Sequence, residues 1–161
     1  MKQVGNMKAT EASIQYILGR HYGINRSNII IPNIRMDYGR YEADLILINK
    51  NQFLIEMEIK ISFSDFKADF MKKNFHNNSK LRGLYYVFPH ELWLKYQNRI
   101  REMVIEVGAG IITVHNYDVY VQRKPKWKDV KPLTKEEVAH YMRLGCLKWI
   151  RKWGETNECR G

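Results

Sequence analysis

ADLILINKNQFLIEMEIKI, residues 43–61, is the stretch that decides the fold. Two apolar runs, 43–48 and 53–61, flank a polar segment at 49–52 that is typical of a hairpin turn. In the second run an apolar side chain stands at every odd position, while Glu56, Glu58 and Lys60 occupy even positions. Because side chains alternate between the two faces of a strand, this stretch predicts two antiparallel strands with charges gathered on one face of the second.

The sequence around this hairpin alternates between helical and strand patterns. Before the hairpin we expect a helix over 10–22 capped by Thr10 and a strand over 28–34. After it we expect a helix from 62 or 64 to about 77, a strand over 83–89 and a helix over 90–103. The chain would then form a hairpin over 110–123 that turns at Asn116, and a last helix over 134–153 opened by a capping box. Pro32 predicts an edge position or a strand end for the strand over 28–34. The pattern predicts an α/β fold with a mixed central sheet flanked by helices. Its core would span 1–123, with a basic linker and an extra C-terminal helix over 124–161, packed on the core or appended to it.

Charge and composition restrict the class of protein. The 161 residues include 27 Lys and Arg against 17 Asp and Glu, which leaves a net charge of +10, and 45% are hydrophobic. That apolar content argues against disorder, and the positive excess favours a polyanionic partner, most simply nucleic acid. No apolar run is long enough to span a bilayer and the first residues lack a signal-peptide core, so we expect no membrane partner. Cys146 and Cys159 are expected to be reduced thiols of a cytoplasmic protein.

The charged residues of the hairpin form a candidate catalytic set. Asp44 on the first strand and Glu58 and Lys60 on the second would bring two carboxylates and an ammonium group together. With the backbone carbonyl of Ile59, the carboxylates suit a hard cation, Mg²⁺ or Mn²⁺, and a neighbouring lysine can stabilise charge during phosphodiester hydrolysis. The alternative is a solvated strand face on which Glu and Lys pair across strands.

Asp44 followed by Glu58-Ile59-Lys60 resembles the motif of the PD-(D/E)XK nuclease superfamily, with Ala43 where the motif has proline. EIKISFSDFKADF, residues 58–70, together with LYYVFP, residues 84–89, resembles the MmcB-like branch of DNA-repair nucleases. The resemblance covers residues 10–123. It implies a restriction-endonuclease-like core, metal ligation by Asp44 and Glu58, and a catalytic role for Lys60.

The expected function is therefore metal-dependent hydrolysis of DNA phosphodiester bonds, in DNA repair, recombination or restriction. The rival is a nucleic-acid-binding protein that keeps the fold without the reaction. A homodimer would bring two sites to the two strands of a duplex, and both a monomer and a homodimer stay open.

Several residues have secondary candidate roles. Glu11 and Glu56 are candidate additional metal ligands; the alternatives are a first-turn acid on an exposed helix face for Glu11 and a solvated strand end for Glu56. Asp65 and Asp69 are expected as acids at a helix start, and Trp149 and Trp153 as packing residues. The expected DNA contacts are Lys67, Lys72, Lys73, His76, Lys80, Arg82, Arg123, Lys124 and Lys126.

Overall fold

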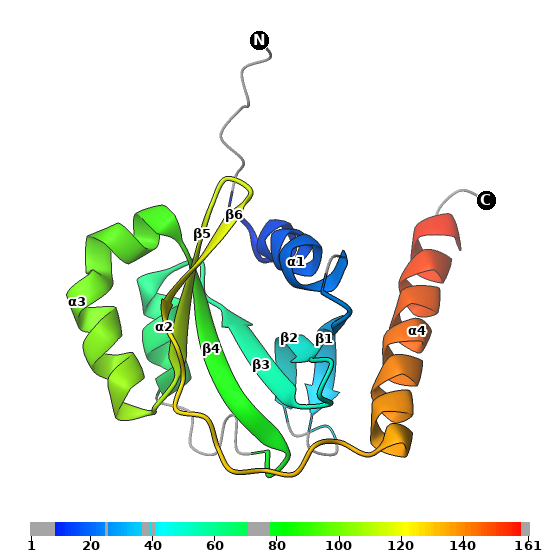
Figure 1. Cartoon of the computed structure of the whole chain (residues 1–161). Coiled ribbons are helices and arrows are strands. Elements are labelled where there is room, and N and C mark those ends of the chain that lie inside the picture. Colours follow the sequence, from blue (N-terminus) through cyan, green and yellow to red (C-terminus); the bar gives the residue numbers. More distant parts are fainter. Residues whose placement is uncertain (1–8, 25, 37–38, 40, 71–77, 159–161) are drawn as a thin grey trace.

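The computed structural model describes residues 9–24, 26–36, 39, 41–70 and 78–158 (Figure 1). The elements in chain order are α1 Glu11–Gly19, the π-helix η1 Arg20–Ile24, β1 Ile29–Met36, β2 Tyr41–Ile48, β3 Leu54–Ile59, α2 Phe63–Phe70, β4 Leu81–Pro89, α3 His90–Glu106, β5 Gly110–His115, β6 Asp118–Arg123 and α4 Lys135–Glu158. The strands form one sheet in the order β1 to β6, in which β4 runs parallel to β3 and β5 and the other pairs are antiparallel. The predicted α/β fold with a mixed central sheet is confirmed.

The first helix begins where the sequence predicts and ends earlier. The Thr10 hydroxyl accepts a hydrogen bond from the Ser13 N–H at 3.1 Å, and the Ser13 hydroxyl oxygen accepts one from the Thr10 N–H at 2.9 Å. The α-helix ends at Gly19, and the chain continues as the π-helix η1 instead of keeping α-helical turns to Tyr22. Within that wider turn, Tyr22 packs against the apolar cluster beneath α1.

The β2–β3 hairpin forms as predicted, with shifted ends. Its turn is held by the Asn49 side-chain oxygen, which accepts hydrogen bonds from the N–H groups of Asn51 and Phe53, both at 3.0 Å. β2 begins at Tyr41, two residues before the predicted run over 43–48, and β3 ends at Ile59, two residues before the end of the predicted run over 53–61. β1 is an edge strand, which is where Pro32 is tolerated.

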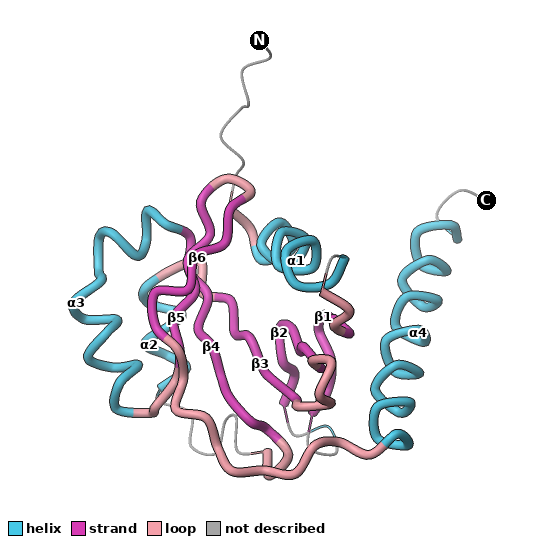
Figure 2. The backbone as a smooth tube through the Cα atoms, viewed as in Figure 1, coloured by secondary structure: helices cyan, strands magenta, loops and turns pink. Residues whose placement is uncertain are grey.

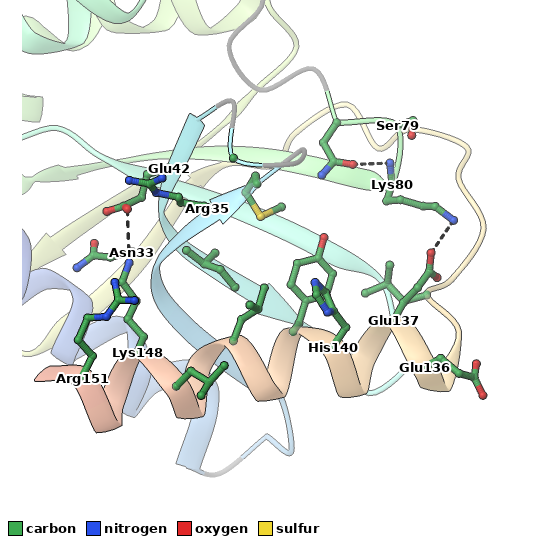
Figure 3. Close-up of a pocket in the computed structure, with 18 residues that line it drawn as sticks. Asn33, Arg35, Glu42, Ser79, Lys80, Glu136, Glu137, His140, Lys148 and Arg151 are labelled. Carbon is green, nitrogen blue, oxygen red and sulfur yellow. Dashed lines mark hydrogen bonds and ion pairs between the residues drawn. The ribbon is translucent and has the colours of Figure 1, made fainter. Parts of the chain in front are cut away.

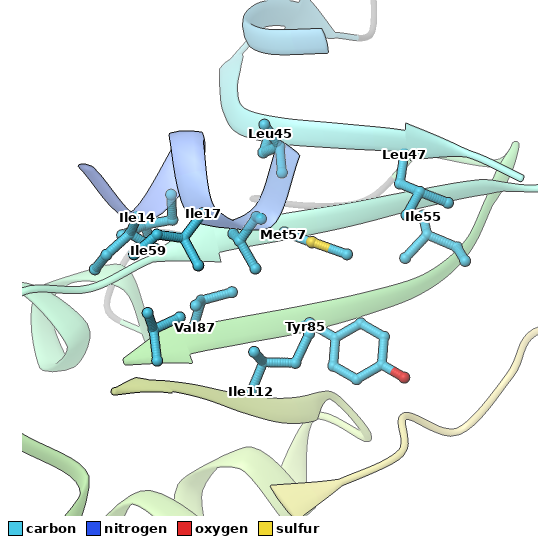
Figure 4. Packing of buried hydrophobic residues seen from close by; sticks show 12 residues of the cluster. Ile14, Ile17, Leu45, Leu47, Ile55, Met57, Ile59, Tyr85, Val87 and Ile112 are labelled. Atoms are coloured by element: carbon cyan, nitrogen blue, oxygen red, sulfur yellow. The ribbon is translucent and has the colours of Figure 1, made fainter. Parts of the chain in front are cut away.

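Both faces of the sheet are covered by helices. α1 lies on one face, where Ile14 and Ile17 pack with Leu45, Met57 and other apolar side chains of the strands (Figure 4). On the other face, α2 and α3 cover β4 and β5, while α4 covers β1 and β2. The charged side chains of β3 lie on this second face.

The segment after β6 is tied to the core, so the extra helix is packed on the core and is not merely appended to it. Figure 2 shows this loop running along one end of the sheet to α4. The N–H groups of Lys126, Lys128 and Leu133 donate to the backbone carbonyls of Gly108, Arg82 and Gln52 at 2.8, 2.8 and 2.9 Å.

The last helix opens with the predicted Thr134–Glu137 capping box and runs to Glu158, five residues beyond the predicted end. It packs through Tyr141 and Leu144. The packing role expected for Trp149 and Trp153 is wrong, because they are 68% and 65% exposed on the side of α4 turned to solvent. In the described part of the chain, no helix combines the length and apolar character that a bilayer crossing requires.

Candidate functional site

The charged side chains of β3 and of Lys60, which directly follows the strand, are buried, not solvated. Glu56, Glu58 and Lys60 are 0%, 3% and 6% exposed, so the alternative of a solvated strand face is wrong. After Lys60 the chain turns directly into α2, where the Ser62 hydroxyl accepts a hydrogen bond from the Asp65 N–H at 3.1 Å, and this helix brings Asp69 to Lys60. Burying charge costs free energy unless each group has a partner of opposite charge or a hydrogen bond.

Asp44 and Glu58 meet where the β2–β3 ladder stops. The last backbone-paired residues are Leu45 and Met57. Beyond them, Asp44 Oδ2 accepts a hydrogen bond from the Ile59 N–H at 2.8 Å, and Glu58 Oε1 accepts one from the Asp44 N–H at 3.3 Å. Side-chain carboxylates thus replace the backbone ladder, which brings both predicted metal ligands together.

Lys60 lies between two carboxylates. Its ammonium nitrogen is 3.4 Å from Glu58 Oε2 and 3.3 Å from Asp69 Oδ1. Burial by itself lowers the pKa of Lys60, but the charges of Glu58 and Asp69 outweigh it, and the pKa lies above its ordinary value. The side chain is therefore a fixed positive charge beside the candidate metal ligands.

Asp69 is the site residue that sequence reasoning missed. It lies in the last turn of α2, is 4% exposed, and its Oδ2 accepts a hydrogen bond from the Tyr86 hydroxyl at 3.0 Å. The expected helix-start role is therefore wrong for Asp69, whereas Asp65 does lie in the first turn. The sequence shows only that Asp69 follows Phe66 by three residues and therefore shares its face of the helix. That this face is covered is seen in the structure, where Phe66 is fully buried.

Glu56 is held deeper in the same face. The Tyr41 hydroxyl donates to Glu56 Oε2 at 2.8 Å, and burial followed by the Glu56 charge raises the pKa of Tyr41. Because Glu56 is fully buried, the alternative of a solvated strand end is wrong. A cation at Glu56 would have to compete with this hydroxyl.

Glu11 stands exposed at the edge of the site, near Asp44. The pKa of Glu11 is raised by partial burial and then by the charge of Asp44. Gln15, which the sequence did not single out, connects the two: its Nε2 donates to Glu11 Oε1 at 3.2 Å and to the Asp44 carbonyl at 2.8 Å. Glu11 is exposed in the first turn of α1, as the alternative expected, and its role as a further metal ligand stays a prediction.

The donor set fits a hard divalent cation. Burial raises the pKa of Asp44 against the lowering effects of the Ile59 N–H and Lys60, so a further positive charge would favour the ionised carboxyl. Among the residues that the structure describes, no three His, Cys, Asp or Glu side chains are grouped as a metal site. The ligands available at this position are the carboxylates of Asp44 and Glu58, the nearby Ile59 carbonyl and water, a set that Mg²⁺ accepts.

The predicted DNA contacts are spread over the molecule. Lys67 is exposed on α2, whereas Lys80 is paired with Glu137 at 2.9 Å. The Arg82 guanidinium lies 3.9 Å from the centre of the Phe53 ring, near the start of β4 and away from Glu58, which is level with Tyr86. Arg123 donates to the Ala109 carbonyl at 3.3 Å, and Lys124 and Lys126 are exposed in the following loop. Lys72, Lys73 and His76 lie outside the described residues.

Comparisons with known proteins bear on the fold. No family model and no curated protein matches the chain. A solved structure, described as SPO1766 protein of unknown function from Silicibacter pomeroyi, aligns with a TM-score of 0.61. The alignment covers 96% of this chain and 97% of that one at 10% sequence identity. At that identity the similarity shows a shared fold and carries no statement about activity.

Proposed function

We propose that this chain is a Mg²⁺-dependent DNA nuclease with a restriction-endonuclease-like core, a member of the PD-(D/E)XK superfamily close to its MmcB-like branch. The observation that carries the proposal is the joining of Asp44, Glu58 and Lys60 in one buried cluster at the end of the β2–β3 hairpin. The net charge of +10 supports DNA as the substrate, and repair, recombination or restriction as the setting.

Each residue of the cluster has a separate role. Asp44 and Glu58 would hold the cation with the Ile59 carbonyl, and Glu11 stands where it can bind a water molecule at the edge of the site. Mg²⁺, when bound, supplies Lewis-acid stabilisation of charge on the phosphate oxygens. Water attacks the phosphorus and the bond from phosphorus to one sugar oxygen breaks, which leaves a phosphomonoester and a hydroxyl. Lys60, held charged by two carboxylates, donates hydrogen bonds to the oxygens on which negative charge develops.

The arrangement favours an enzyme over a protein that only binds nucleic acid. A binding surface needs exposed cations to contact phosphates, and it gains nothing from carboxylates beside them. Here the carboxylates of Glu56, Glu58 and Asp69 are buried together with the ammonium group of Lys60. Removing these charges from water costs free energy, and a protein that only binds nucleic acid has no need of such an arrangement.

A cleavage assay on a panel of DNA forms tests the proposal. Single-stranded, duplex, flap and supercoiled DNA would be incubated with the protein in Mg²⁺, Mn²⁺ or EDTA. The proposal expects cleavage of at least one form with either cation and none in EDTA. Binding of DNA without cleavage of any form in either cation would favour the rival, a non-catalytic binding protein.

A further inference from the structure

A groove of about 1000 Å³ lies between α4 and the strands β1 and β2 (Figure 3). Apolar side chains from both elements line much of its length. Tyr141 and Leu144 are half-buried and Leu147 is exposed there, while Ile34, Met36 and Leu133 are almost fully buried beneath them. Such a surface can accept flat apolar groups that would otherwise face water.

Positive charge gathers at one end of this groove. Arg35, Lys148 and Arg151 lie there around a single acid, Glu42, whose carboxylate is 3.5 Å from the Lys148 ammonium (Figure 3). The other end carries more acid than base: Lys80 is paired with Glu137, and Glu136 lies beside them. Only the first end can attract an anion.

The cationic end adjoins the proposed catalytic site. Asn33, which lines the groove, accepts a hydrogen bond from Gln15 Nε2 at 2.7 Å, and the same nitrogen donates to the Asp44 carbonyl at 2.8 Å. Glu42 precedes Asp44 by two residues on β2. Asp44, Glu58 and Lys60 do not line the groove, so an anionic chain in it would approach the cluster past Asn33 and Gln15.

We infer that this groove binds a single-stranded segment of nucleic acid, continuous with the strand to be cut. Arg35, Lys148 and Arg151 would contact its phosphates, and unpaired bases would lie against an apolar wall formed by Tyr141, Leu144 and Leu147. Single strands are held in this way, by cations along the backbone and by apolar or aromatic side chains against the bases. In a duplex the base faces are stacked inside, so the apolar wall would have no partner. That the bound strand runs toward Asp44 rests on the proposed function.

Binding by the full-length chain in EDTA tests the groove separately from catalysis. The probe is a fluorescein-labelled oligothymidylate of about 15 nucleotides, compared with a duplex of the same length. The variant is Arg35→Gln with Arg151→Gln; the matched control is Arg101→Gln with Arg143→Gln, two exposed arginines that do not line the groove. Circular dichroism checks that each variant is folded.

We expect the groove variant to bind the single strand about tenfold more weakly at low salt, and its salt dependence to fall by about 0.7 in log–log slope for each lost contact. The control should bind nearly as wild type. Unchanged binding by the groove variant, or an equal loss in the control, would overturn the inference. So would wild-type binding to vesicles of phosphatidylcholine with phosphatidylserine but not to the oligonucleotide.

Cleavage by the same proteins separates the two proposals. If the groove variant loses single-strand binding, and neither it nor the wild type cuts DNA in Mg²⁺ or Mn²⁺, the groove is a binding site and the proposed function is wrong. If wild type and the groove variant bind and cut DNA equally well, the proposed function holds and the groove is not the binding site.

Discussion

The two faces of β3 are equally buried and chemically opposite. Ile55, Met57 and Ile59 pack with α1 and the neighbouring strands, where any apolar side chain of similar volume would serve. On the other face, Glu56 and Glu58 are no more exposed, yet each needs a specific partner. Burial therefore does not separate core from site in this strand; the distinguishing property is whether a buried group depends on particular partners.

Lys60→Met should have the largest effect, because it removes the charge between Glu58 and Asp69. Without a cation, two carboxylates would face each other, and we expect the free energy of unfolding to fall by about 3–5 kcal/mol. Cleavage should be lost. Urea unfolding in EDTA and a cleavage assay measure the two effects.

The double variant Lys60→Met with Asp69→Asn is the control for charge. It should regain part of the lost stability because the repulsion is relieved, but no cleavage. Recovery of cleavage together with stability would show that Lys60 acts only in folding.

Met57→Ala probes the apolar face of the same strand. Met57 is 1% exposed, and truncating a buried methionine costs about 2–5 kcal/mol of unfolding free energy. The cleavage rate per folded molecule should match that of wild type. A specific loss of cleavage in fully folded Met57→Ala would contradict the division between the two faces.

Asp69→Asn should have a smaller effect, since Lys60 keeps Glu58 as its counter-charge. Because Asp69 positions Lys60 and is not expected to touch substrate, we expect kcat to fall about 10–100-fold with KM for DNA nearly unchanged. Steady-state kinetics separate the two parameters. A rise in KM with constant kcat would place Asp69 in DNA binding instead.

Tyr41→Phe should have the smallest effect. It removes the hydroxyl that donates to Glu56, which costs about 1–3 kcal/mol of unfolding free energy. Cleavage per folded molecule should be unchanged, because Tyr41 and Glu56 contribute stability. A loss of cleavage as great as that expected for Asp69→Asn would show that Glu56 takes part in catalysis.

Local patterns in the sequence predict most of the elements and the shared face of Glu58 and Lys60. The Thr10 cap, the turn after Asn49 and the alternation in 53–61 are encoded by neighbouring residues, so they can be read without tertiary structure. The same reasoning fails for Trp149 and Trp153, because helical spacing defines a face but does not say whether another element covers it.

The contacts that complete the site depend on tertiary structure. The Asp44–Ile59 hydrogen bond requires the β2–β3 ladder to stop at Leu45, and no local pattern marks that point. Burial of Glu56 depends on Tyr41, which lies before the strand predicted over 43–48. The position of Asp69 depends on which face of α2 meets the sheet.

Glu58→Gln compared with Glu56→Gln in Mg²⁺-dependent cleavage of DNA tests the central claim most directly. Both are buried glutamates on one face of one strand, and the substitution removes one charge in each. We expect Glu58→Gln to cut DNA at least about 10²-fold more slowly than wild type, and Glu56→Gln to cut at the wild-type rate per folded molecule. Wild-type cleavage by folded Glu58→Gln, or an equal loss in both variants, would contradict it.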